Sequence, residues 1–306
     1  MTIRSRGAAP YAILGISQLA VGAAAIFARY ALTGAHPIAV SAARLIIASV
    51  ILLTVGMVRR SPDRVRATGK QNVLFIGGGL CLAIHFVGWI SSLEYTTVAV
   101  STLLVTTTPI WTALYDTIFL KRPLSWVAWA AFGAGGVGLL LVVGFTAAAP
   151  PISGHGLLGA ILALIGAFAI GAYWILVREV RDRFGTRAIV TRTYSWAALA
   201  LLIATLFARQ SPPPLSDGIA WGGILAMAII SQLIGHTALN ACLKWFTPNA
   251  ISFATVLEPV IAAVLALLIF HETLGGVAIA GGIVLLTAIG VVLREERRRE
   301  VLDLAL

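Results

Sequence analysis

Long apolar stretches follow one another along almost the whole chain, separated by short polar connections. An α-helix that crosses a bilayer needs about 20 mostly apolar residues, and ten stretches of this kind can be marked out. They are residues 11–31, 37–58, 72–92, 96–119, 125–145, 155–177, 188–208, 219–242, 250–270 and 274–293. The pattern predicts an all-α membrane protein with ten transmembrane helices.

The composition supports the membrane interpretation. Hydrophobic residues make up 59% of the 306 residues and charged residues only 11%, whereas about 25% of a soluble domain is charged. Lipid can surround this excess of apolar surface, provided that helices satisfy the backbone hydrogen bonds. The two cysteines, Cys81 and Cys242, lie far apart inside apolar stretches, which is too few ligands for a disulfide framework or a metal site. We therefore predict neither a metal nor a cofactor.

The basic residues are concentrated in alternate connections. With the N-terminus placed inside the cell, all but four of the 22 Lys and Arg residues fall at the inside-facing ends and connections. The exceptions are Arg29 and Arg209 on the outside, and Arg44 and Arg192 within spans. Cytoplasmic connections carry such an excess, so we predict that both ends are cytoplasmic. The net charge of +10 then reflects topology and requires no nucleic acid partner.

The two halves of the chain resemble each other. Residues 95–101 (YTTVAVS) are similar to residues 246–252 (FTPNAIS). Further matched positions are Pro109 with Pro259, Arg44 with Arg192, and His85 with His236. We predict two repeats, residues 1–149 and 150–306, with five spans each. Because five is odd, the second repeat enters the membrane upside down, which is the plan of many secondary transporters.

The clearest motif lies in the second half. Ala250-Ile251-Ser252 is followed by Leu257-Glu258-Pro259-Val260 and then by Phe270-His271-Glu272-Thr273-Leu274. With this motif the chain resembles the drug/metabolite transporter superfamily, in its ten-helix branch built from two EamA-type domains. The first half departs from the pattern, with Thr108-Pro109 in place of Glu-Pro and Lys121-Arg122-Pro123-Leu124 at the turn.

The resemblance covers nearly the whole chain, and Arg44 matches an arginine common in the second helix of this family. It implies export of small metabolites, often amino acids, from the bacterial cytoplasm across the inner membrane. Within the branch, the chain is similar to the aromatic amino acid exporters. The implied partners are a small-molecule substrate, most simply an amino acid, and the lipid bilayer.

Glu258 is the sharpest candidate for a functional residue. It lies about nine residues into its predicted span, near the bilayer midplane, where an ionisable group is costly and usually faces a cavity or a partner. The neighbouring Pro259 removes a backbone donor. One interpretation is a site for a substrate ammonium group or for a coupling proton. The other is a carboxyl group that is hydrogen-bonded to a neighbouring helix and holds a kink.

Polar side chains recur at helical spacing in the third and eighth spans. Gln232, His236 and Asn240 are four residues apart, which places them on one face of an α-helix. His85 and Trp89 share a face with Cys81 and Ser92 in the same way. We favour an interpretation in which both faces line a central cavity, with hydrogen bonding between helices as the alternative.

Hydroxyl and aromatic groups supply further candidates. Ser101, Thr108, Thr112 and Tyr115 lie on one face beside Pro109 and can bind a substrate carboxylate or bond within their own helix. Tyr173 and Trp174 can stack on an aromatic substrate, although an aromatic belt at the membrane surface is the commoner explanation. We expect the side chain of Arg192 to extend to the lipid headgroups. Whether Arg44 does the same stays open.

Ten residues are thus candidates for substrate binding. They are His85, Trp89, Ser101, Thr108, Tyr115, Trp174, Gln232, His236, Asn240 and Glu258, of which Glu258 is also the coupling candidate. The spans contain no dense group of catalytic residues and the chain no phosphate-binding loop. We therefore predict no catalytic residue and no enzymatic activity.

The function predicted from these features is secondary transport by alternating access around a central cavity. Nucleosides, sugars and cationic drugs are alternative substrate classes to amino acids. A non-transporting scaffold or receptor is a further alternative, which a dry interior would favour. Whether the protein is a monomer or a homodimer stays open, because Gly-rich stretches at 133–136 and 281–282 can pack within the bundle or between protomers.

Overall fold

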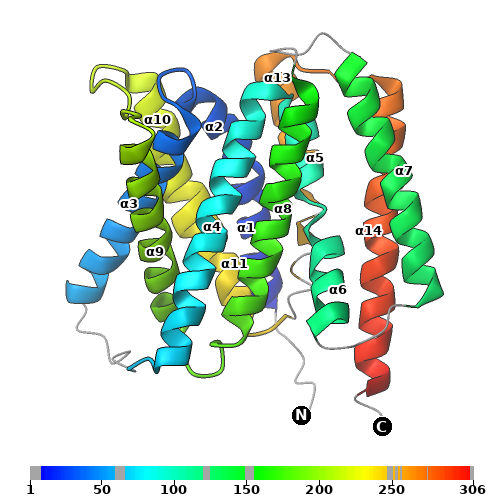
Figure 1. The fold of residues 1–306 in the computed structure, drawn as a ribbon, viewed down its shortest axis with the longest axis horizontal. Coiled ribbons are helices and arrows are strands. Elements are labelled where there is room, and N and C mark those ends of the chain that lie inside the picture. The colour runs from blue at the N-terminus through cyan, green and yellow to red at the C-terminus, as the bar shows by residue number, and fades with distance from the viewer. Residues whose placement is uncertain are drawn as a thin grey trace.

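The protein is a bundle of helices (Figure 1). The computed structural model describes residues 8–58, 66–119, 125–148, 155–246, 251, 254–255, 257–273 and 275–303. The first-half helices are α1 (Ala8–Gly22), α2 (Ala24–Ala31), α3 (Pro37–Val58), α4 (Gly69–Tyr95), α5 (Val98–Val105), α6 (Thr108–Phe119) and α7 (Trp126–Ala148). The second-half helices are α8 (Gly156–Arg178), α9 (Thr186–Phe207), α10 (Gly218–Ala226), the π-helix η1 (Met227–His236), α11 (Thr237–Cys242), α13 (Leu257–Phe270) and α14 (Gly276–Asp303).

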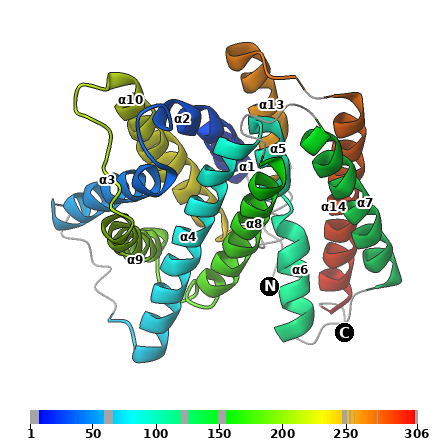
Figure 2. The same ribbon diagram turned by 45° about the horizontal axis from the view of Figure 1, so that its top comes forward.

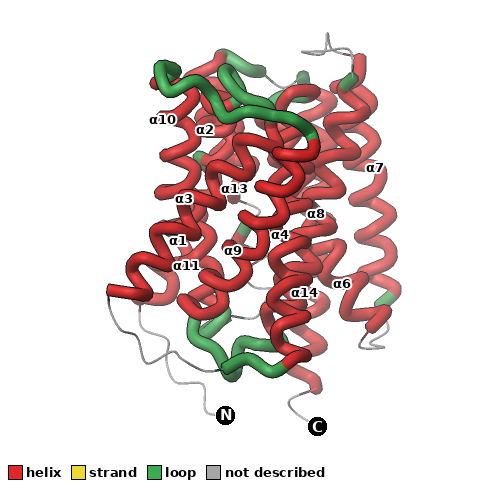
Figure 3. Tube along the Cα trace, turned by 60° about the vertical axis from the view of Figure 1, so that its left-hand side comes forward, coloured by secondary structure: helices red, strands yellow, loops and turns green. Residues whose placement is uncertain are grey.

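These helices confirm the predicted fold class. Within the described residues, seven helical runs are long and apolar enough to cross a membrane, among them the combined runs Ala8–Ala31 and Gly218–Cys242. The helices α7, α13 and α14 occupy the three remaining predicted spans. Connections gather at the two ends of the bundle, as the tube drawing shows (Figure 3). The structure is therefore an all-α membrane protein with the predicted number and order of spans.

The fourth span differs from the single helix that was expected over 96–119. It is interrupted between α5 and α6, because Pro109 has no N–H to donate to the carbonyl of Val105, where α5 ends. The same chemistry recurs in the second half, where α13 begins at Leu257, two residues before Pro259. In both halves the proline thus lies next to a helix terminus within the span, which is the end of α5 in the first half and the start of α13 in the second.

The last helix extends beyond the predicted end at residue 293. The helix α14 continues to Asp303 through a charged segment, in which Arg298 pairs with Glu295. Hydropathy marks where the apolar part stops, but Arg and Glu are good helix formers, so the helix continues past that point. Several residues named above lie outside the described part: Lys121 to Leu124, Thr247 to Ala250, Ser252 and Leu274.

The helices pack in symmetrical pairs. Equivalent helices of the two halves pack against each other, α3 with α9, α5 with α13 and α7 with α14. The packing of α4 on α8 has its counterpart in the packing of α10 and η1 on α2 and α1. Figure 2 shows α7 and α14 side by side, with α3 and α9 in the opposite part of the bundle. Exchange of the two halves leaves this set of contacts unchanged, so the two halves take equivalent places in the bundle.

Small residues allow the closest helix contacts. A Cβ atom at Gly88 of α4 would lie only 2.8 Å from the carbonyl oxygen of Leu162 in α8. A Cβ atom at Gly138 of α7 would lie 2.7 Å from the carbonyl oxygen of Gly281 in α14. The second of these contacts means that the Gly-rich parts of α7 and α14 pack on each other within the bundle.

Candidate functional site

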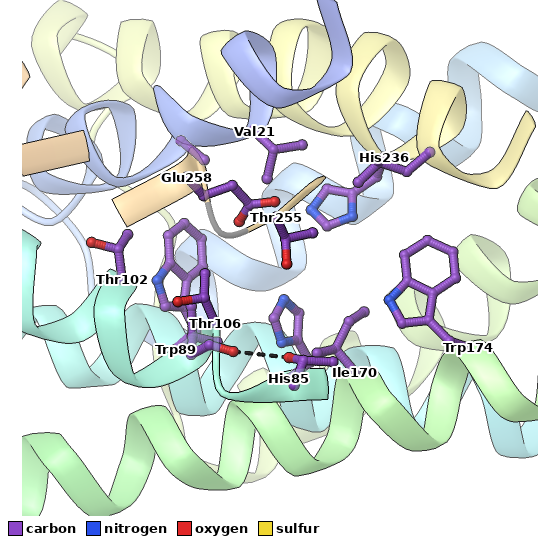
Figure 4. Close-up of a pocket in the computed structure, with 14 residues that line it drawn as sticks. Val21, His85, Trp89, Thr102, Thr106, Ile170, Trp174, His236, Thr255 and Glu258 are labelled. Carbon is purple, nitrogen blue, oxygen red and sulfur yellow. Dashed lines mark hydrogen bonds between the residues drawn. The ribbon is translucent and has the colours of Figure 1, made fainter. Parts of the chain in front are cut away.

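A cavity of about 50 Å³ lies at the centre of the bundle, and we call it the central cavity. Helices of both halves form its walls, and Figure 4 shows the lining side chains. They are Val21, Ala24, His85, Trp89, Thr102, Val105, Thr106, Thr108, Ile170, Trp174, His236, Leu239, Thr255 and Glu258. The end of α5, the first residue of α6 and the start of α13 contribute to this lining, so the interrupted helices meet at the cavity.

Six of the ten candidate residues line the central cavity. They are His85, Trp89, Thr108, Trp174, His236 and Glu258. The structure brings them together from five elements, α4, α6, α8, η1 and α13. That these residues bind a substrate stays a prediction. Their placement around one cavity is what a common binding site requires.

The other four candidates have partners elsewhere. The Ser101 hydroxyl lies 2.6 Å from the Ser92 hydroxyl, and the ring of Tyr115 lies 5.0 Å from that of Phe168. Gln232 Oε1 accepts a hydrogen bond from Arg44, and Asn240 Oδ1 accepts one from Tyr173. None of the four is in the described lining of the cavity.

The π-helix explains why the stripe of Gln232, His236 and Asn240 is divided. The expected common face assumed α-helical geometry, but η1 covers Met227–His236, and a π-helix has a wider turn with bonds from i to i+5. As a result, His236 faces the cavity whereas Gln232 faces Arg44. Asn240 lies beyond the π-helix, in α11, and bonds Tyr173 and the carbonyl of His236. Sequence periodicity gives no sign of this change in helix type.

Thr102, Thr106 and Thr255 are polar lining residues that the sequence analysis missed. A signal for the first two exists, because hydroxyl residues are dense just before Pro109 and Thr102 and Thr106 are four residues apart. Their hydroxyl groups donate to carbonyl oxygens of their own helix, Thr102 to Val98 and Thr106 to Leu103. These hydroxyls therefore offer oxygen lone pairs to the cavity.

The two cavity histidines lie close to each other. Their ring centroids are 6.3 Å apart, and the ring of His85 is stacked parallel to Trp89. His85 Nδ1 lies 2.9 Å from the carbonyl oxygen of Gly166. A carbonyl can only accept, so Nδ1 carries the hydrogen, and in the neutral ring Nε2 is an acceptor.

Glu258 places a carboxyl group in the cavity. Its side chain is 9% exposed, and Figure 4 shows it directed into the space beside Trp89 and His236. It lies in the first turn of α13, where a negative charge interacts favourably with the helix dipole. Within the described residues, the ion pairs join Arg29 to Glu272 and Arg298 to Glu295, so Glu258 has no basic partner there.

Arg44 is buried behind the cavity wall and does not extend to the headgroups. Its side chain is fully buried, its Nε donates to Gln232 at 2.9 Å, and its guanidinium lies 4.0 Å from the centre of the Phe86 ring. Arg192, by contrast, is only half-buried and lies beside the rings of Phe75 and Phe184.

Comparisons with known proteins agree with this architecture. The model of the EamA-like transporter family matches the chain twice, over residues 10–144 and 157–294. The chain therefore belongs to the EamA-like transporter family, as the sequence motifs indicated. The predicted boundary between residues 149 and 150 falls between the two matches.

Two relatives extend the comparison. An uncharacterized transporter of Clostridium kluyveri is 22% identical over 234 residues, which are 75% of this chain and 74% of that protein. A solved crystal structure superposes with a TM-score of 0.66 and 19% sequence identity, covering 96% of this chain and 99% of that one. The match to this crystal structure shows that the two chains share a fold.

Proposed function

We propose that this protein is a secondary transporter that carries a small solute through the central cavity by alternating access. The observation that carries the proposal is Glu258, an ionisable group in a cavity between two repeats. A carboxyl group at this depth is costly to keep inside a membrane, and it has no basic partner in the described residues. A solute that binds there supplies the missing partner.

The cavity as described is too small for most metabolites. Its volume of about 50 Å³ compares with roughly 300–1,000 Å³ for typical ligand pockets. Binding therefore requires the two repeats to move apart around the cavity, as inverted repeats do in other transporters. Helix ends at Pro109 and Pro259 provide places where the chain can bend without breaking a complete set of helix hydrogen bonds.

The direction and orientation are part of the proposal. The start of α1 and the end of α14 lie at the same end of the bundle (Figure 1). The basic connection from Arg178 to Arg187 follows α8 at this end. The positive-inside rule then makes this end cytoplasmic. We propose an inner membrane location and export, with no covalent bond made or broken in the solute.

Amino acids, including aromatic ones, are the first substrate class to test. The ammonium group can pair with Glu258, and the indole rings of Trp89 and Trp174 in the lining can stack on an aromatic side chain. The same features suit other solutes that carry a positive charge, which is the second class. Since a carboxylate can hold either a proton or an ammonium group, Glu258 is also the proposed site of coupling.

The experiment that tests the function is flux in proteoliposomes. Labelled amino acids, amines, nucleosides and sugars are offered with and without a pH gradient, and the recovered solute is analysed for chemical change. We expect saturable flux of at least one unchanged, positively charged solute, and loss of this flux in the Glu258→Gln variant. Full activity of that variant, or no flux of any solute by folded protein, contradicts the proposal.

A further inference from the structure

The polar atoms of the central cavity are mainly hydrogen-bond acceptors. The hydroxyl of Thr108 donates to the carbonyl of Val105 at 2.8 Å, and that of Thr106 to Leu103 at 2.9 Å. The hydroxyl of Thr102 is engaged in the same way. A hydroxyl has one hydrogen and two lone pairs, so these three groups present only acceptors to a solute.

Two more lining residues add acceptors. Because Nδ1 of His85 donates to Gly166, its Nε2 carries the lone pair of the neutral ring. The carboxylate of Glu258 adds two oxygens and the single formal negative charge of the described lining. The cavity thus combines one carboxylate with several neutral acceptors.

Donors in the lining are few and uncharged. Trp89 and Trp174 each contribute an indole N–H to the lining, which can only donate, and Trp89 Nε1 is buried without a hydrogen-bond partner. His236 can offer one N–H group in its neutral form, and its Nδ1 also has no partner. No Lys or Arg is in the described lining, since Arg44 is covered by the ring of Phe86.

This distribution discriminates between the two ends of an amino acid. An ammonium group has three donors and finds a carboxylate, hydroxyl oxygens, Nε2 of His85 and the ring face of Trp89, which attracts cations. A carboxylate finds only neutral donors, namely the two indole N–H groups and His236, together with the like charge of Glu258. Desolvation of a charged group is costly unless opposite charge or several hydrogen bonds replace the water, so the carboxylate is the poorly matched end.

We propose that the cavity selects organic amines without a free carboxylate, whose apolar or aromatic body packs against Trp174, Ile170 and Leu239 of the lining. This inference rests on the proposed transport function and narrows its substrate class. It places aromatic and aliphatic amines ahead of the corresponding amino acids.

Matched pairs of solutes test the inference. Tryptamine with tryptophan, and phenethylamine with phenylalanine, differ by one carboxylate. We expect that each amine competes at least about tenfold better than its amino acid, which corresponds to about 1.4 kcal/mol, both in binding to purified protein and in proteoliposome flux. Equal or better performance of the amino acids overturns the inference and leaves the transport proposal intact. Binding of amines without any flux leaves the inference intact and overturns transport.

Two variants locate the selectivity in the cavity. Thr106→Val removes a lining acceptor and should weaken amine binding about threefold to tenfold, while the weak binding of the amino acid changes less. Thr205→Val is the matched control, because Thr205 is a buried threonine of α9 that bonds the carbonyl of Leu201 and is not in the described lining. An equal loss of amine binding in both variants, or no loss in Thr106→Val, contradicts the proposal that the cavity lining selects the amine. This test does not depend on whether the Glu258→Gln variant folds.

Discussion

Arg29 and Glu272, which are 243 residues apart in the sequence, form an ion pair that joins the two halves of the bundle. The other carboxylate oxygen of Glu272 accepts the N–H of Val98 at 2.9 Å, at the start of α5. Glu272 follows α13, so one carboxylate connects α2, α5 and the end of α13. All three helices also line the central cavity, through Ala24, Thr102 and Glu258. The pair therefore ties together three helices that line the cavity.

Removal of this charge should open the cavity at the end where Glu272 lies. In Glu272→Gln the ion pair is lost, and charge-assisted hydrogen bonds contribute roughly 1.5–3 kcal/mol each. We expect a cysteine placed at Thr102, in a chain whose two native cysteines are replaced by alanine, to react about tenfold faster with a membrane-impermeant maleimide. The increase should occur only when the reagent is added at the end where Glu272 lies.

The control for this experiment is Glu295→Gln. Glu295 pairs with Arg298 at 4.0 Å, and the Arg298 side chain is 75% exposed, so this pair contributes little. We expect unchanged labelling in the control. Equal labelling rates in Glu272→Gln and the unaltered chain would show that the pair does not keep the cavity closed.

Gly88 should be intolerant of even one additional methyl group. Its Cβ position lies 2.8 Å from a backbone oxygen of α8, and backbone atoms cannot move aside without shifting the helix, which costs about 1–3 kcal/mol. Gly77→Ala in the same helix is the control, because its nearest neighbour is the end of the Leu176 side chain at 3.4 Å. There we expect no change or a gain of up to about 1 kcal/mol. Thermal unfolding in detergent measures the stability of Gly88→Ala and Gly77→Ala. Equal stability of the two variants contradicts the close contact at Gly88.

Gln232 should matter for stability and not for the choice of substrate. Gln232→Leu removes the acceptor for the Nε of buried Arg44, and the loss of a hydrogen bond to a charged group costs about 1.5–3 kcal/mol. Neither side chain is in the described lining, so the preference for amines over amino acids should be retained. A changed preference with unaltered thermal stability would place Gln232 in the binding site instead.

The ring of Trp89 should contribute more than its N–H group. Trp89→Phe keeps an aromatic face in the lining but removes the unpartnered donor, and we expect amine affinity within about threefold of the original protein. Trp89→Ala removes the face as well and should reduce affinity at least about tenfold, because an aromatic face attracts a desolvated cation by about 2 kcal/mol. Calorimetric titration with tryptamine distinguishes them. If Trp89→Phe lost as much amine affinity as Trp89→Ala, the N–H donor would be the essential group.

Apolar length and charge distribution were sufficient to predict the number and order of the helices, since both features depend on lipid and not on particular contacts. Local bonding was harder to predict. The π-helix at Met227–His236 leaves hydropathy unchanged but rotates the side chains within it, so that His236 lines the cavity and Gln232 does not.

The partners of charged residues were the least predictable feature. Glu272 stood out in the sequence only through its family motif, and nothing near it in sequence points to Arg29. The sequence left open whether Arg44 extends toward the headgroups, and the structure shows that it packs inside on Phe86 and bonds Gln232. Such contacts arise from the packing of helices far apart in the chain, and they emerge only once the bundle is assembled.

The two prolines that interrupt the fourth span of each repeat are equivalent, but their preceding residues are not: Thr108 stands before Pro109 and Glu258 before Pro259. Both residues line the cavity. A scaffold with two matching halves thus encloses a site of uneven electrical character, with one carboxylate where symmetry would allow two. Under the proposed function, a singly charged amine would balance the charge of Glu258, whereas a diamine would add a second charge with no partner in the described lining. Under that proposal, the charge carried per transport cycle would depend on this single difference between the repeats.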